Sequence, residues 1–355
     1  MKKFLAAILT AVLIISGFTA VPAFAEEEQK IKVTSSIYPI YDWVNQVIGE
    51  RSEKIDHELL LKSSIDLHSY QPSVEDMVRI AESDLFLFVG GHSDKWVADA
   101  LEQANEDLEI INLMEVLGDD AKLDAIVEGM EHNHDHDHDH NHDHEPAHDH
   151  DHEHSHEGID ALDEHVWLSL RNAEKFVKAI AEKLSEVDPE GEEIYHENAK
   201  AYIKELKALD KKYQKAVGES EVTTLIVADR FPFRYLFNDY AIDYYAAFSG
   251  CSAESEASFE MVAFLSDKLE ELNLDNLLVL ENSSEKVAES IIKNSNDENR
   301  EIIVLDSLQS LSDKDLTQVD SYLESMEQNL EALKKALGVN AEEAAEGEAE
   351  ETEAK

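Results

Sequence analysis

The sequence predicts an α/β protein with two lobes, each a parallel sheet covered by helices, joined by a long interlobe helix. Short apolar runs alternate with stretches of helical periodicity in each half of the chain. Strands that alternate with helices in this way favour parallel sheets covered on both faces. Two strongly helical stretches separate the halves. The 355 residues, 43% of them apolar, also suffice for two lobes with ordinary cores.

The predicted strands are apolar runs bounded by polar or turn residues. They span residues 31–37, 59–61, 85–89, 108–113, 222–228, 242–248, 277–281 and 302–305. Helical periodicity fills most of the intervals between them. It predicts helices over residues 41–48, 73–81, 94–104, 259–272, 285–293 and 316–337. Each repeat of strand, helix and strand predicts a pair of parallel neighbours.

Residues 172–217 are predicted to link the lobes. This stretch is interrupted at Pro189, which suits the first turn of a second helix. That second helix would be roughly 40 Å long at a rise of 1.5 Å per residue, so it would act as a strut that permits only small rocking motions. The predicted domains are therefore an N-terminal lobe over 31–171, linking helices over 172–217 and a C-terminal lobe over 218–338.

The N-terminus has the pattern of a secretory signal peptide. Two lysines precede an apolar run from Phe4 to Ile15, and small residues follow at Ala23 and Ala25. The run is shorter than the roughly 20 residues that a membrane-spanning helix needs. We expect residues 1–25 to be a signal peptide cleaved after Ala25, and the mature protein to be exported to a periplasm or to the medium. Because no cysteine ends the signal, no lipid anchor is expected.

Two segments of low complexity are not expected to contribute to a core. The acidic tail 341–355 is mostly Glu and Ala. Residues 131–157 hold 12 histidines, 10 Asp or Glu and no basic residue, so a disordered loop that binds metal weakly at many imidazoles is predicted. Its candidate ligands are His132, His134, His136, His138, His140, His142, His144, His148, His150, His152, His154 and His156. Two interpretations stay open: the loop collects metal for a tighter site, or it is a solvated acidic spacer.

Charge and cysteine content exclude several classes of protein. With 79 acidic and 30 basic side chains, the formal net charge is −49. This charge argues against nucleic acid or an anionic membrane as a partner and favours cations. The single cysteine excludes an intramolecular disulfide and a multi-cysteine zinc finger.

Four side chains with metal-binding donors lie where a ligand site is expected. His68, Asp229 and Asp306 follow predicted strands, and His165 precedes the first linking helix. Ligands of open α/β sheets bind beyond the carboxyl ends of the strands. Taken singly, each residue has an ordinary interpretation as a structural hydrogen-bonding group or a cap. Together they predict a metal site in the cleft between the lobes.

Four motifs resemble the metal-binding receptors of bacterial ABC importers, the cluster A-I group, which captures zinc or manganese. Residues 66–73, DLHSYQPS, are similar to the family's Asp-Pro-His-x-Tyr-x-Pro-Thr. Residues 163–169, DEHVWLS, are similar to Asp-Pro-His-Val-Trp-Leu-Ser. Residues 81–86 and 252–258 also resemble the family. The resemblance covers about residues 31–338, and the His-rich insertion lies where zinc receptors of this group carry one.

The resemblance implies that His68 is the first metal ligand, His165 the second and Asp306 the fourth. Arg230 occupies the usual position of the third ligand, and arginine donates hydrogen bonds only. Either Asp229 replaces it from the next position, or another group reaches the metal. The leading candidate for that group is Cys251, since thiolate is an excellent zinc ligand, although a small buried apolar role for this residue also stays open.

The implied function is an extracytoplasmic receptor that captures Zn²⁺ in the interlobe cleft and delivers it to an ABC importer. The partner would be a membrane permease with a cytoplasmic ATPase, and the receptor is expected to be a monomer. Mn²⁺ is the alternative metal, and a stand-alone extracellular metal buffer or adhesin is the alternative function. We expect no enzyme, because four protein ligands around zinc leave no water to activate, and the sequence lacks the common hydrolase motifs.

Overall fold

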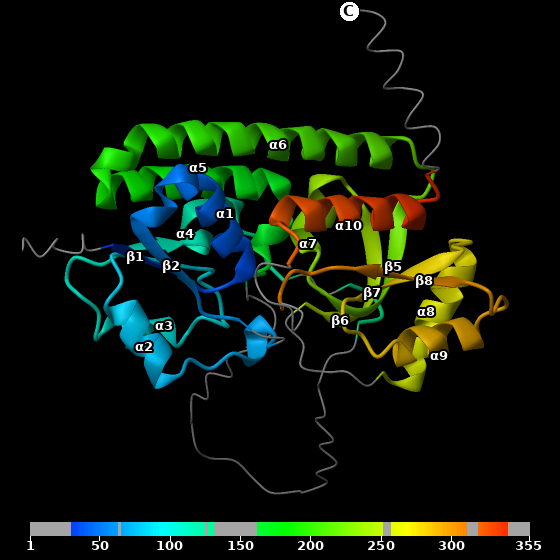
Figure 1. Cartoon of the computed structure of the whole chain (residues 1–355). Helices are drawn as coiled ribbons and strands as arrows, with labels where there is room; N and C mark the ends of the chain where they lie inside the picture. Colours follow the sequence, from blue (N-terminus) through cyan, green and yellow to red (C-terminus); the bar gives the residue numbers. More distant parts are fainter. Residues whose placement is uncertain are drawn as a thin grey trace, which may run out of the picture.

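The computed structural model describes residues 30–62, 65–124, 127–130, 162–250, 257–310 and 319–339. These residues form two lobes, each built on a parallel four-stranded sheet, beneath the long helix α6, Glu192–Gly218 (Figure 1). The predicted signal peptide, the His-rich loop, Cys251 and the acidic tail lie outside the described residues.

The N-terminal lobe has the strand order β2-β1-β3-β4, with all pairs parallel. Its central strand β3 is apolar and completely buried, as expected for a strand covered on both faces. The strands are β1 Ile31–Ser35, β2 Ile55–Leu59, β3 Leu85–Phe88 and β4 Glu109–Asn112. The helices are α1 Tyr38–Ile48, α2 Val74–Ala81, α3 Val97–Leu101 and α4 Leu113–Leu117.

The C-terminal lobe repeats this topology with the order β6-β5-β7-β8, again parallel. One sheet face joins the main core, and the other packs on α8 and α9 through a second cluster that includes Ile226, Leu265, Val279 and Ile291. The strands are β5 Thr224–Phe231, β6 Asp243–Ser249, β7 Asn276–Leu280 and β8 Glu301–Leu305. The helices are α7 Arg234–Asp239, α8 Phe259–Glu271, α9 Lys286–Asn294 and α10 Tyr322–Ala336. The predicted two-lobe α/β fold is confirmed.

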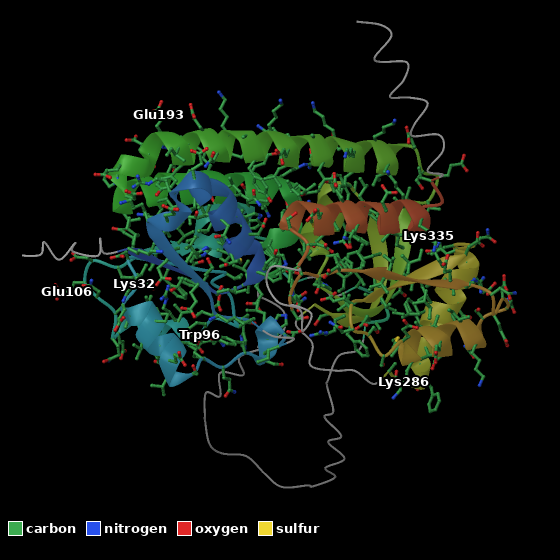
Figure 2. All side chains as sticks on the ribbon, in the orientation of Figure 1. Lys32, Trp96, Glu106, Glu193, Lys286 and Lys335 are labelled. Carbon is green, nitrogen blue, oxygen red and sulfur yellow. The ribbon has the colours of Figure 1, made fainter. Side chains whose placement is uncertain are left out.

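Helix α6 connects the lobes. It packs against α5, Leu170–Val187, and α1 in the N-terminal lobe and against α10 in the C-terminal lobe. Figure 2 shows Lys32 and Trp96 on one lobe, Lys286 and Lys335 on the other, and Glu193 on the outer side of α6. Although α6 is about 40 Å long by its rise per residue, no described helix, α6 included, is both long and apolar enough to cross a membrane.

Several predicted element boundaries are wrong. Strand β2 covers Ile55–Leu59 instead of residues 59–61. As an edge strand it buries Ile55 and Leu59 and exposes Asp56, so the apolar run marks only its end. Helix α10 starts at Tyr322 because a capping box formed by Ser321 and Glu324 fixes its first turn. The short helices α4 and α7 were not predicted, since they have fewer residues than a periodic pattern needs.

Candidate metal centre

His68 lies on a one-turn 3₁₀ helix, Leu67–Ser69, in the loop that follows β2. The turn begins at Asp66, whose Oδ1 accepts the backbone N–H of His68 at 2.9 Å. Leu67 is buried and anchors the turn in the core of the N-terminal lobe. His68 is therefore held by a cap on one side and an apolar anchor on the other, while its side chain stays partly exposed.

His165 lies at the start of a second 3₁₀ turn, Val166–Leu168, just before α5. Its side chain is completely buried, as are those of the three turn residues. Asp163 Oδ1 accepts both the backbone N–H of His165 at 2.8 Å and a hydrogen bond from its Nδ1 at 2.9 Å. The imidazole is thus fixed by a carboxylate two residues earlier in the chain.

The two predicted histidines face each other. His68 Nε2 lies 3.1 Å from His165 Nε2, and the rings meet edge to face at an interplanar angle of 64°. Two nitrogens bound tetrahedrally to one zinc ion at about 2.0–2.1 Å would be separated by about 3.3 Å. The pair is therefore spaced almost as two ligands of one metal ion would be.

The hydrogen bonds at the other ring nitrogens indicate which tautomer each histidine adopts. Ser93 Oγ donates to Glu164 Oε1 at 2.7 Å, so its oxygen accepts from His68 Nδ1, 2.8 Å away. Glu164 Oε1 also lies 3.2 Å from His68 Nδ1. Asp163 is the acceptor for Nδ1 of His165. With the protons on Nδ1, the Nε2 lone pairs of the two rings face each other, and a metal ion or a proton shared by both nitrogens relieves this arrangement.

The pKa of Glu164, a buried carboxylate beside the pair, is lowered. Burial opposes ionisation of Glu164, but the hydrogen bonds from His68 and Ser93 lower its pKa to about 2. Burial also disfavours the charged form of His165, yet the charge and hydrogen bond of Asp163 raise its pKa. A metal ion that binds His165 therefore competes with a proton that Asp163 stabilises.

Asp229 and Arg230 lie near the carboxyl end of β5, where the pairing with β6 is shifted between Val227 and Arg230. Asp229 Oδ1 accepts the backbone N–H of Arg230 at 2.8 Å. The guanidinium of Arg230 reaches the other lobe, and its Nη2 donates to Asp66 Oδ2 at 2.9 Å. The arginine at the usual third-ligand position thus pairs with the cap of the His68 turn.

Asp306 follows β8 and lies beside a second carboxylate, Glu281, at the end of β7. Asp306 Oδ1 accepts the backbone N–H of Leu308 at 2.8 Å. Burial, and then the charge of Asp306, raise the pKa of Glu281 to about 7. The carbonyl of Ser307 accepts the indole N–H of Trp167 at 2.9 Å, so this loop contacts the His165 turn.

The end of β6 approaches His165 closely. A Cβ placed on Gly250 would lie 3.0 Å from Cε1 of His165 and 2.8 Å from the carbonyl oxygen of Phe231. Only glycine allows the backbone to pass at this distance. Cys251 is the next residue in the chain and is outside the described residues.

The structure thus brings His68 and His165 together, whereas Asp229 and Asp306 are not gathered around them. Within the described part of the chain, no group of three or more His, Cys, Asp or Glu side chains could hold a metal ion. Asp229, Cys251 and Asp306 stay predicted ligands. Asp163 and Glu164, which orient the imidazoles, were not among the predicted site residues. The available signal was the sequence Asp-x-His, which occurs at both histidines.

Known proteins share both the sequence pattern and the architecture. Residues 33–336 match the family model described as zinc-uptake complex component A, periplasmic. The high-affinity zinc uptake system protein ZnuA of Bacillus subtilis is 30% identical over 309 residues, which cover 87% of this chain and 88% of that protein. The zinc-binding lipoprotein AdcA of Streptococcus pneumoniae is 29% identical over 313 residues, covering 87% of this chain but 56% of the relative. The chain therefore spans about half the length of the streptococcal relatives it matches.

A solved structure extends the similarity to three dimensions. The Zn(II)-bound ZnuA-like domain of Streptococcus pneumoniae AdcA has a TM-score of 0.64 and 26% sequence identity, covering 87% of this chain and 99% of that domain. The family match and the identity to the Bacillus protein both extend over most of the chain. The chain belongs to the zinc-uptake complex component A family.

Proposed function

We propose that this protein captures Zn²⁺ between its lobes and delivers it to an ABC importer. The observation that supports this proposal is the His68–His165 pair, whose two Nε2 atoms lie 3.1 Å apart. Nδ1 of His165 is bonded to Asp163, and Nδ1 of His68 is bonded to Ser93, which in turn donates to Glu164. Histidines that bind metals commonly donate the second ring N–H in this way, which fixes the ring and makes it a better ligand. The pair is preorganised for a cation that accepts nitrogen donors.

Zinc is the metal that this donor set favours. Imidazole nitrogen suits zinc, whereas a site for manganese is richer in carboxylate and water oxygen. Asp306 is the proposed carboxylate ligand from the C-terminal lobe, and its loop contacts the His165 turn through Ser307 and Trp167. Mn²⁺ stays the alternative if carboxylates supply the two remaining positions.

A receptor explains the arrangement better than an enzyme does. Zinc closed in by four protein ligands has no position for a reactive water molecule, so it is cargo rather than a catalyst. We propose that a membrane permease with its ATPase takes the metal from a monomeric receptor. This role follows the name of the Bacillus relative, a high-affinity zinc uptake system protein.

The test combines binding and transport. Zinc titration of the metal-free chain should give one tight site, and deletion of the gene should reduce growth at low zinc until the wild-type gene restores it. Tight binding without any transport defect would favour the alternative of a stand-alone metal buffer or adhesin. No tight zinc site, or a preference for Mn²⁺, would contradict the proposal.

Single substitutions identify the remaining ligands. Asp306→Asn, Asp229→Ala and Cys251→Ser are compared by zinc affinity in the otherwise unchanged chain. We expect Asp306→Asn to weaken binding, together with either Asp229→Ala or Cys251→Ser. If all three variants bind zinc as the wild type does, the proposed ligand set is wrong.

The loop 131–157 is proposed to collect zinc at low affinity and pass it to the tight site. The proposal rests on its composition of alternating imidazoles and carboxylates. Deletion of residues 132–156 should remove the weakly bound zinc, leave the tight site in place and slow uptake at low zinc. Unchanged zinc stoichiometry and uptake would support the acidic spacer instead.

Export with cleavage after Ala25 also remains a proposal, supported by the signal-like sequence of residues 1–25. The pneumococcal relative is named a lipoprotein, whereas this chain has no cysteine at the end of its signal-like segment. Mass spectrometry of the exported protein should find Glu26 as its first residue with no added lipid. A lipid-modified product would contradict the expected absence of an anchor.

A further inference from the structure

An ion pair joins the two lobes beside the histidine pair. Arg230, on β5 of the C-terminal lobe, donates from Nη2 to Asp66 Oδ2 on the N-terminal lobe at 2.9 Å. About a quarter of each side chain is exposed, 26% for Arg230 and 25% for Asp66. The two residues are 164 positions apart in the sequence, so the contact depends on how the lobes meet.

The two oxygens of Asp66 have separate tasks. Oδ1 accepts the backbone N–H of His68, and Oδ2 accepts the guanidinium of Arg230. Because a carboxylate is a rigid planar group, a pull on one oxygen is transmitted to the other. Arg230 therefore holds, from the opposite lobe, the turn that carries a proposed zinc ligand.

The local backbone places Arg230 for this contact. The register of β5 with β6 shifts between Val227 and Arg230, and such irregularities redirect side chains at the ends of strands near binding sites. Arginine stays protonated and has no lone pair for a metal, so its effect on the site must pass through another residue. Asp66 is the residue that it contacts.

We propose that Arg230 is a positioning residue that ties the C-terminal lobe to the His68 turn and thereby slows the release of bound zinc. This inference rests on the proposed function. Separation of the lobes at the cleft removes the His68 turn from β5 and must break the ion pair between Asp66 and Arg230. Loss of the pair should therefore act mainly on the rate of metal release.

The decisive variant removes both charges together. Arg230→Gln alone would leave the unpaired negative charge of Asp66 near the metal ion. That charge would attract the ion and so obscure the effect of losing the ion pair. Asp66→Asn combined with Arg230→Gln leaves the net charge of the region unchanged. The control is Asp56→Asn with Arg79→Gln, an ion pair of the same 2.9 Å length within the N-terminal lobe, in which Arg79 also pairs with Glu58.

Zinc release from the loaded full chain into excess chelator is followed by stopped flow, with thermal unfolding measured in parallel. We expect the double variant at Asp66 and Arg230 to release zinc about two- to fivefold faster, at unchanged zinc stoichiometry. The control pair should release zinc at the wild-type rate.

Equal release rates in the wild type and the Asp66/Arg230 double variant would overturn the inference. An equal acceleration in the control pair would also overturn it, since the effect would then be a general loss of stability. If the double variant does not fold, Arg230→Lys, which keeps the charge but loses the planar fork, should still release zinc faster than the wild type does. A wild-type chain that binds no zinc tightly would instead refute the proposed function, so the two failures are distinguishable.

Discussion

The two Asp-x-His turns of the candidate metal centre have the same sequence pattern but are supported differently. At the second turn, Asp163 binds both the backbone and the imidazole of His165, and all of these groups are buried. At the first turn, Asp66 binds only the backbone of His68, and its other oxygen pairs with Arg230. The imidazole of His68 is instead contacted by Ser93 and by Glu164, which belongs to the second turn.

This difference separates a fixed half of the site from an adjustable half. The segment 163–169 around His165 contacts C-terminal elements through several hydrogen bonds: Tyr235 donates to the carbonyl of Asp163, Tyr322 donates to that of Trp167, Trp167 donates to the carbonyl of Ser307, and Ser169 donates to Asp239. The His68 turn belongs to the N-terminal lobe and reaches the other lobe through an ion pair between partly exposed side chains. The proposed capture and release of a metal ion would be served by one rigidly held ligand and one held through a partly exposed contact.

The largest predicted effect distinguishes the two histidines by stability. His165→Ala would leave the buried carboxylate of Asp163 without its imidazole donor, and an unsatisfied buried charged group costs about 3 kcal/mol. His68→Ala should cost the metal-free protein about 1 kcal/mol, a typical hydrogen-bond contribution, because its ring is partly exposed. Denaturant unfolding of both variants measures these losses, with exposed His92→Ala as the control. Equal losses at His68 and His165 would remove the distinction between the two turns.

The carboxylates that orient the imidazoles give the next largest effect. Asp163→Asn and Glu164→Gln should each weaken zinc binding by about 10–100-fold, the usual cost of losing a group that orients a metal ligand. The exposed carboxylate Glu82, which pairs with Lys32, provides the control Glu82→Gln. Zinc affinity is measured by competition with a chelator. Wild-type affinity in both Asp163→Asn and Glu164→Gln would show that the carboxylates do not tune the site.

A third histidine, His57, has no carboxylate among its hydrogen-bond partners in the described residues, and its pKa shifts in the opposite direction to that of His165. His57 Nδ1 donates to Asn45 Oδ1, and its Nε2 accepts from the hydroxyl of Ser35, each at 2.9 Å. Burial, and then the charge of Arg79, lower the pKa of His57 to about 3, whereas Asp163 raises that of His165. Carboxylate partners thus separate the histidines of the candidate site from a structural one.

A predicted effect confined to acidic pH follows from the lowered pKa of His57. The unfolded chain takes up a proton at this residue near pH 6.5, while the folded chain does so only near pH 3. The unfolded state binds more protons in this window, so stability falls as the pH falls, by up to about 1.4 kcal/mol per pH unit. His57→Gln should reduce the slope of unfolding free energy against pH between 6 and 4 by about this amount. An unchanged slope would contradict the low pKa.

Much of the fold could be predicted from the sequence, because buried parallel strands are continuous apolar runs and their helices are periodic. The position of strand β2 could not be predicted, because this edge strand contains Asp56, His57 and Glu58 and therefore lacks a continuous apolar run. His68 and His165 could be predicted from their position after a strand and before a helix. The role of Arg230 could not, since the approach of Asp66 on the other lobe depends on how the lobes pack.

The most direct test of the account is the position of the metal itself. A crystal of the zinc-loaded chain, with anomalous scattering recorded at the zinc edge, should show a single strong peak about 2.0–2.1 Å from Nε2 of both His68 and His165. A peak bonded to Nδ1, to only one of these rings or to neither would contradict the claim that the paired imidazoles capture the ion.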